Sequence, residues 1–317
     1  MILKKNNLFI NPQGIGDLAI PIKYFISNLI DNKSDYNDFI IQYESQKRII
    51  KKYNKSKSHY FFSKIFYKFN LKNFKKLNKI RNTFYENVFI DPNIHIIKAI
   101  LISIMLRSNN KIFKEFIFHK FFFAKSLKYS KQHRKKYYQK LSRQFVNTKS
   151  SFKIKKKNEK KIIYGIAPGT GGLEKHKRWN WENFANLINN SKIKPDEVYI
   201  FGNEIRITNL IKKKIKIKTR IINYSNINKS IEKLLSLKMI ITNDNGIANF
   251  AAIYGIRSFI ICGPSIPNSI KNFTNVKIIK KKLPCSPCYD KMRFGCGNPI
   301  CLTEFSSDLV SKKIGLS

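Results

Sequence analysis

The sequence predicts an α/β protein with two domains, each built around a doubly wound parallel sheet. The chain has 317 residues, enough for two domains that each bury a core of their own. Short apolar segments typical of strands alternate with amphipathic segments typical of helices in both halves. Polar turns containing glycine follow several of the expected strands, at the place where an open parallel sheet binds its ligands.

The N-terminal half begins with a strand, a turn and a helix. We expect the strand at residues 8–11, the turn at 12–17 and the helix at 18–30. Apolar side chains recur in that helix at the spacing of one buried face: Leu18, Ile22, Phe25, Ile26 and Leu29. A further strand at 88–90 and a helix at 93–106 continue the alternation.

A lysine-rich stretch with little apolar periodicity, residues 147–161, is expected to link the two domains. The predicted domains are therefore 1–155 and 156–317. Beyond the linker the expected strands lie at 162–167, 198–201, 239–242 and 258–262. Three helices are expected in this half. The first begins after Asn180, which is a typical N-cap residue, the second lies at 230–237, and the third runs from the turn after residue 242 to Gly255.

The formal net charge of +43, from 62 Lys and Arg against 19 Asp and Glu, raises the alternative of a nucleic-acid-binding protein. Only 10 of the 62 basic residues are arginine, the side chain that makes bidentate contacts to phosphate and guanine. The abundant Lys, Ile, Asn, Phe and Tyr share A/T-rich codons, so codon drift accounts for much of the charge. We therefore expect no nucleic-acid partner, and keep this function as the alternative.

Three turns carry the candidate site residues. The first, 13–17, contains two glycines and ends in Asp17, which either acts in a site or caps the helix that follows. The second, 167–172, contains Thr170 and Gly171 and is followed by cations, so its amides suit a diphosphate. The third, 243–249, opens an alanine-rich helix whose amides also suit an anion.

Taken in order, these segments resemble glycosyltransferase family 9, the ADP-heptose:lipopolysaccharide heptosyltransferase family. The resemblance covers most of the chain and is weak at residues 46–82. The matching pieces are Gly16-Asp17 with Pro21, Pro168-Gly169, Lys177-Arg178-Trp179, Asn243-Asp244-Asn245-Gly246 with Ala251-Ala252, Gly263-Pro264-Ser265 and Cys285-Ser286-Pro287-Cys288.

The resemblance implies a GT-B architecture, with two Rossmann-like domains facing a cleft. It implies that the N-terminal domain takes the acceptor, a phosphorylated glycolipid of the lipopolysaccharide core, and the C-terminal domain the nucleotide-sugar, ADP-heptose. Transfer would invert the anomeric centre without a metal cofactor. Asp17 would be the general base and Lys177 would stabilise the leaving nucleoside diphosphate.

The same resemblance implies a set of donor-binding residues: Thr170, Gly171, Glu204, Asp244, Asn245, Gly246 and Asn249. Glu204 would bind the ribose, although an exposed glutamate at a helix start is an equal alternative. The family has serine or threonine where this chain has Asn245, and histidine where it has Asn249. These departures leave open a related donor sugar, or a degenerate member that binds sugar nucleotides without catalysis.

Four cysteines follow the spacing C-x2-C-x7-C-x4-C: Cys285, Cys288, Cys296 and Cys301. In a reducing compartment this cluster suggests a structural zinc ion, with unligated thiols or a disulfide as alternatives. Cys262 ends an apolar strand and is expected in the core. His133 lies in a basic, helix-like stretch, and we expect it to be either a structural residue or a residue on the acceptor side.

Two segments, 45–85 and 116–158, hold 13 and 14 basic residues and no acidic one. Phe61, Phe62, Ile65, Phe66 and Phe69 would share one face of a helix with lysines interleaved. Such a helix either lies on an anionic membrane surface or packs on the N-terminal domain. Because no targeting or membrane-spanning segment is evident, we expect a cytoplasmic protein, peripheral on the inner membrane.

Overall fold

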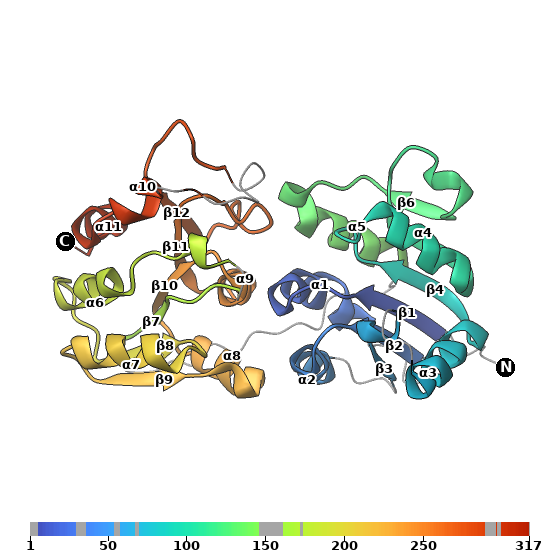
Figure 1. The fold of residues 1–317 in the computed structure, drawn as a ribbon, viewed down its shortest axis with the longest axis horizontal. Coiled ribbons are helices and arrows are strands. Elements are labelled where there is room, and N and C mark those ends of the chain that lie inside the picture. Colours follow the sequence, from blue (N-terminus) through green and yellow to red (C-terminus); the bar gives the residue numbers. More distant parts are fainter. Residues whose placement is uncertain are drawn as a thin grey trace. The chain divides into compact units, whose positions relative to one another are not determined.

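The computed structural model describes residues 6–29, 36–53, 58–66, 70–145, 161–171, 174–288, 296 and 299–316. The chain divides into two compact units, Met1–Phe152 and Lys153–Ser317. Each unit is a six-stranded sheet with helices packed against it (Figure 1). Most of the expected linker, 147–161, lies outside the described residues.

The sheet of unit 1 has the strand order β3-β2-β1-β4-β5-β6, and all neighbouring strands are parallel. Its strands are β1 (Asn6–Asn11), β2 (Tyr36–Ile41), β3 (Tyr60–Phe62), β4 (Phe84–Ile90), β5 (Arg107–Lys114) and β6 (Lys125–Leu127). Its α-helices are α1 (Ala19–Tyr24), α2 (Glu44–Tyr53), α3 (Leu71–Asn82), α4 (Ile96–Met105) and α5 (Arg134–Phe145). Short 3-10 turns are η1 (Ile15–Leu18), η2 (Ile26–Asn28), η3 (Ser63–Phe66), η4 (His119–Phe121) and η5 (Lys131–His133).

The sheet of unit 2 repeats this pattern, with the order β12-β11-β10-β7-β8-β9 and parallel pairing throughout. Its strands are β7 (Ile163–Ala167), β8 (Glu197–Phe201), β9 (Thr219–Ile222), β10 (Met239–Asn243), β11 (Arg257–Cys262) and β12 (Val276–Lys280). Its α-helices are α6 (Trp181–Asn189), α7 (Ile205–Lys214), α8 (Ile227–Leu234), α9 (Gly246–Ile253), α10 (Ile300–Thr303) and α11 (Ser307–Ile314). The 3-10 turns are η6 (Lys175–Lys177) and η7 (Tyr224–Asn226).

Both sheets are doubly wound, as the alternation of strands and helices predicts. In unit 1 the chain runs outward from β1 to β3 on one side of the sheet and from β4 to β6 on the other. In unit 2 it runs outward from β7 to β9 on one side and from β10 to β12 on the other. The strand order therefore reverses between β1 and β4, and between β7 and β10. At such a switch point the loops at the carboxyl ends diverge to opposite faces and leave room for a ligand.

The central strands are buried on both faces, as parallel strands covered by helices must be. All five residues of β7 and of β10 are buried. In unit 1, rings from β1, from the residue after α1 and from β4 meet in the core, where the Phe25 ring packs edge-on against Phe89 at 4.7 Å between centroids. The buried Trp179 packs in the same manner on Phe184 in unit 2, at 4.9 Å.

The expected helix at 18–30 is interrupted. All five residues of its apolar stripe are buried or nearly so, as predicted. The backbone of Phe25, however, leaves the helical region with φ −143° and ψ −61°, so that α1 ends at Tyr24 and η2 follows. The buried stripe is therefore correct although the continuous helix is not.

The amphipathic helix expected from Phe61 onward is absent from the described residues, which corrects both the membrane and the packed-helix interpretation. Phe61 lies in β3, paired with Ile40 of β2, and is 5% exposed. Ile65 lies in the 3-10 turn η3 and is buried. Phe69 falls outside the described residues. Aromatic side chains suit a strand that pairs with the sheet edge, and this tertiary pairing outweighs the helical spacing.

Among the helices of the described segments, none has both the length and the apolar character needed to span a bilayer.

Gly263 follows β11 at a close approach to α10. A Cβ atom there would lie 2.6 Å from Leu302 Cγ and 2.9 Å from Cys301 Sγ, in a buried contact. We predict that Gly263→Ala destabilises the protein by about 1–3 kcal/mol, because the core must shift to admit the methyl group. Chemical denaturation measures this, with Gly169→Ala as control, since no atom lies within 4 Å of a Cβ at that position. Equal midpoints for the two variants would contradict the prediction.

Candidate functional site

Asp17 lies in η1, directly after β1, at the switch point of unit 1. Its Oδ1 accepts a hydrogen bond of 2.6 Å from Arg134 Nη1, and its backbone oxygen accepts one of 2.9 Å from Nη2 of the same guanidinium. The side chain is 40% exposed, and no hydrogen bond to Oδ2 is formed by a described residue. One carboxylate oxygen is thus held from inside the protein while the other remains available to a ligand.

Arg134 is the first residue of α5, and its side chain is only 2% exposed. Its second partner is Asp91, which follows β4 and has no exposed surface. Asp91 Oδ2 accepts hydrogen bonds from Arg134 Nη2 at 2.8 Å, from Asn11 Nδ2 at 2.8 Å and from Tyr138 OH at 2.7 Å. Residues from the ends of β1 and β4 and from α5 therefore form one buried polar network beside Asp17.

Burial alone would lower the pKa of Arg134, but the charges of Asp91 and Asp17 raise it above its ordinary value. Burial raises the pKa of the Tyr138 phenol, and the Asp91 carboxylate raises it further. The guanidinium is therefore charged and the phenol is protonated across the physiological range. The network delivers a fixed positive charge to the inner oxygen of Asp17.

The capping alternative for Asp17 is not what the structure shows. The N-cap residue of η1 is Gly14, and no side chain caps this turn. The Asp17 carboxylate points instead to a residue 117 positions away in the sequence.

Lys177 lies in η6 after the glycine loop of unit 2, and it is 8% exposed. Its ammonium forms an ion pair of 2.6 Å with Glu174 Oε1 and lies 3.8 Å from Asp244 Oδ2. Asp244 Oδ2 also accepts a hydrogen bond of 2.7 Å from Ser265 Oγ. The loops that follow β7, β10 and β11 thus meet around one buried cation.

Thr170 and Glu204 are also brought together, through Arg178, one of the cations that follow the glycine turn. Arg178 Nε donates to Thr170 Oγ1 at 3.0 Å, and its Nη1 donates to Glu204 Oε2 at 2.9 Å. The Thr170 hydroxyl itself donates to the backbone oxygen of Glu174 at 2.8 Å. Glu204 at the N-cap of α7 is therefore an ion-pair partner rather than an isolated surface glutamate.

Asn243 and Asn245 hold the loop after β7 in place. The buried Asn243 donates to Pro168 O at 2.6 Å and accepts from the backbone nitrogen of Trp179 at 3.1 Å. Asn245 caps α9 by accepting from Ala248 N at 3.1 Å, and its Nδ2 donates to Gly169 O at 2.8 Å. Asn245, expected to bind the donor, thus has both ends of its amide engaged in the fold.

The remaining donor-binding candidates lie around the start of α9 and on the preceding loop. Gly246 is the first residue of α9, where the backbone amides of a helix are unpaired and attract anions. Asn249 lies one turn further on, and its buried Oδ1 has no hydrogen-bond partner in the described structure. Gly171 is exposed, and its backbone oxygen accepts from Glu174 N at 2.8 Å.

The expectation of a zinc site is not supported. Cys285, Cys288, Cys296 and Cys301 line one cavity of about 50 Å³, and none of the four forms a disulfide bond in the part of the chain that the structure describes. No group of three or more His, Cys, Asp or Glu in the described ranges is arranged to hold a metal ion. Cys285 and Cys296 are exposed whereas Cys301 is buried at α10. Cys262 is buried in the core, as expected.

The network behind Asp17 was not predicted from the sequence. Asp91 follows an expected strand in the sequence Ile90-Asp91-Pro92-Asn93, and this position at the end of a strand was a usable signal. Arg134 offered no such signal, because it lies among the lysines of a basic segment and nothing local distinguishes it.

Comparison with known proteins agrees with this geometry. A family model described as glycosyltransferase family 9 (heptosyltransferase) matches residues 104–295, more than half of the chain. Lipooligosaccharide heptosyltransferase 2 of Campylobacter jejuni subsp. jejuni serotype O:6 is 30% identical over 164 residues. That match covers 46% of this chain and 50% of the relative, so the chain spans about half the length of the curated relative.

Two solved structures share the fold across the whole chain. Heptosyltransferase WaaC of E. coli with ADP has a TM-score of 0.70 at 11% identity, covering 98% of this chain and 99% of that one. ADP-heptose lps heptosyltransferase II of E. coli has a TM-score of 0.68 at 14% identity, covering 98% and 97%. The expected GT-B fold class is therefore confirmed.

The buried ion pair in unit 1 makes a prediction about stability. Arg134→Leu leaves the Asp91 carboxylate buried without its cation, so we expect a loss of about 3–5 kcal/mol in the free energy of unfolding. The matched control is Arg143→Leu on the same helix, because Arg143 is exposed and forms no ion pair with a described residue. The control should change stability by about 0.5 kcal/mol or less. Urea denaturation of both variants tests this, and equal losses would refute it.

Proposed function

The chain belongs to glycosyltransferase family 9, the heptosyltransferase family, and on that premise we propose that it transfers heptose from ADP-heptose to a lipopolysaccharide-core acceptor. The observation that carries the proposal is the state of Asp17. One of its oxygens is held by the buried Arg134 and the other has no partner among the described residues. A carboxylate prepared in this way suits the general base of an inverting transfer.

In the proposed reaction, Asp17 takes the proton of the acceptor hydroxyl as its oxygen attacks the anomeric carbon of the donor. The bond between that carbon and the diphosphate breaks, and the electron pair leaves with the nucleoside diphosphate. Attack opposite the leaving group inverts the configuration. In this proposal unit 1 takes the acceptor and unit 2 takes the nucleotide-sugar.

Positive charge in unit 2 would stabilise the leaving diphosphate without a metal cofactor. Lys177 is buried, donates a hydrogen bond to Glu174 and forms a longer ion pair with Asp244, so its ammonium is already held in position. The amides at the start of α9 and around Thr170 would add hydrogen bonds to phosphate oxygens. Asp244 would bind donor hydroxyls, and Glu204, beside Arg178, the ribose.

The unpartnered oxygen of Asn249 supports a role in recognising the donor sugar. A buried acceptor without a hydrogen bond is costly, and a sugar hydroxyl could supply the missing donor. Asn249 also replaces the histidine of the family, so the donor could be a relative of heptose. Thermal-shift measurements with ADP-, GDP-, UDP- and dTDP-sugars test this, and the nucleotide-sugar that raises the melting temperature most is identified as the donor.

We further propose that the protein works at the cytoplasmic face of the inner membrane as a peripheral protein. The acceptor is taken to be a phosphorylated glycolipid of that leaflet. The net charge of +43 favours association with such an anionic surface.

The base assignment predicts that Asp17→Asn lowers kcat by about 10²–10⁴-fold, because the amide cannot accept the proton. Binding of the nucleotide-sugar should stay within twofold of wild type. The control is Glu115→Gln, which neutralises an exposed carboxylate of the same unit. Rates measured with purified acceptor and ADP-heptose test this, and undiminished turnover of Asp17→Asn would overturn the assignment.

The donor site makes a separate prediction about nucleotide affinity. Lys177→Ala should weaken ADP binding by roughly 10- to 100-fold, since a buried charge-assisted hydrogen bond is lost. Lys175→Ala on the same turn is the matched control, because Lys175 is exposed. Titration calorimetry with ADP measures both, and an affinity equal to that of the control would remove Lys177 from the site.

A further inference from the structure

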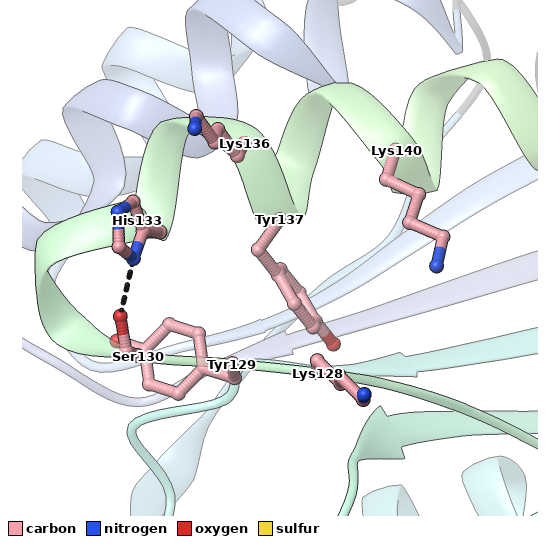
Figure 2. A pocket seen from close by; sticks show the side chains of 7 residues that line it. All are labelled: Lys128, Tyr129, Ser130, His133, Lys136, Tyr137 and Lys140. Carbon is pink, nitrogen blue, oxygen red and sulfur yellow. Dashed lines mark hydrogen bonds between the residues drawn. The ribbon is translucent and has the colours of Figure 1, made fainter.

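A hollow of about 390 Å³ lies in unit 1 between the first turns of α5 and the segment that follows β6 (Figure 2). It is separate from the residues assigned to catalysis above. Its lining combines basic side chains with aromatic ones: Lys128, Tyr129, Ser130, His133, Lys136, Tyr137 and Lys140.

The lining contains three lysines and a histidine but no carboxylate. Lys128, Lys136 and Lys140 are exposed, and none forms an ion pair with a described residue. Lys128 and Lys140 extend toward one end of the hollow from opposite walls, as Figure 2 shows. A concave surface lined by one sign of charge concentrates its field, so this hollow attracts anions.

The other end of the hollow offers hydrogen-bonding groups. Ser130 Oγ and His133 Nδ1 are hydrogen-bonded at 2.8 Å, which orients the imidazole ring (Figure 2). His133 Nε2 has no hydrogen-bond partner within the described segments. The ring nitrogen therefore remains available for a hydroxyl group of a ligand.

Two rigid aromatic rings line the hollow between these ends. The ring of Tyr137 is 3% exposed and packs edge-on with Tyr129 at 5.4 Å between centroids. The Tyr129 hydroxyl donates to Asn93 Oδ1 at 2.5 Å, so this ring is held at both ends. Aromatic rings beside convergent polar groups are the surface on which the apolar face of a sugar ring packs.

The hollow adjoins the Asp17 network. His133 directly precedes Arg134, whose guanidinium contacts Asp17 at 2.6 Å. Burial raises the pKa of Tyr129 to about 12, and the charges of Arg134, Asp91 and Asp17 act on the same phenol. The hollow and the Asp17 network therefore share the start of α5.

We propose that this hollow binds an anionic sugar of the acceptor, with its phosphate or carboxylate at Lys128 and Lys140 and its ring against the partly exposed Tyr129, which the buried Tyr137 supports from behind. This inference rests on the proposed function, since it assigns the recognition of that acceptor to named residues. The lysines act in binding and not in proton transfer, so they should govern the acceptor KM and leave kcat nearly unchanged.

The test uses the full chain and four small probes: glucose 6-phosphate, glucuronic acid, glucose and inorganic phosphate. Saturation-transfer NMR titrations measure their affinities. We expect the phosphorylated or carboxylated sugar to bind about tenfold tighter than glucose and than free phosphate, since each exposed ion pair contributes a few-fold. Whichever of the two sugars binds tighter identifies the anionic group.

The variant Lys128→Ala/Lys140→Ala should remove this preference. Lys212→Ala/Lys213→Ala is the matched control, because it deletes the same charge from exposed positions in the last turn of α7. Equal affinities of wild type for glucose and glucose 6-phosphate would overturn the proposal. So would free phosphate binding as tightly as the phosphorylated sugar, or a preference that survives in the Lys128/Lys140 variant.

A transfer assay separates this inference from the proposed function. With active wild type, the Lys128/Lys140 variant should raise the acceptor KM about tenfold, with kcat and the donor KM within twofold of the control. An acceptor KM equal to that of the control refutes the hollow and leaves the transferase assignment intact. Wild type without transfer, but with lysine-dependent binding of sugar phosphate, refutes the transferase assignment and supports the hollow.

Discussion

The site of unit 1 depends on a buried guanidinium shared by two carboxylates. Asp91, at the end of β4, has no exposed surface, and its charge is tolerated in the core because Arg134 and two neutral donors surround it. The same guanidinium reaches Asp17 on the other side of the switch point. Through its two ion pairs, this guanidinium docks α5 against the sheet and orients the proposed base.

Unit 2 also places polar and charged side chains at the carboxyl ends of its central strands, but the charges differ from those in unit 1. Here the buried Asn243, at the end of β10, ties down the loop after β7 and the backbone at Trp179. The buried charged group of this unit is Lys177, which forms ion pairs with the carboxylates of Glu174 and Asp244, so here a cation lies between two acids. In the reaction proposed above, the carboxylate of unit 1 takes the proton and the ammonium of unit 2 stabilises the leaving diphosphate.

Much of the fold was predictable because parallel sheets leave a strong local pattern. The strands β1, β7, β10 and β11 lie where their apolar runs predicted them, since strands covered on both faces must be apolar. The prediction failed where two patterns competed. The aromatic run from Phe61 has helical spacing, yet it pairs with β2, because the sheet edge offers backbone hydrogen bonds and burial together. The cysteine spacing suggested a metal site that the described side chains do not assemble.

The sequence by itself determined the alternation of strands and helices, the glycine turns at their ends, and Asp17, Lys177 and Asp244 as residues of interest. The alternation and the turns follow from local composition and periodicity, which act over a few residues, and the three site residues follow from the resemblance of their motifs to glycosyltransferase family 9. Only the tertiary structure decided which side chains surround them. Arg134 reaches Asp17 across 117 positions, and Arg178 joins Thr170 to Glu204. Such partners depend on the order of the strands in each parallel sheet, because that order brings strand ends that are distant in the sequence together at the switch points.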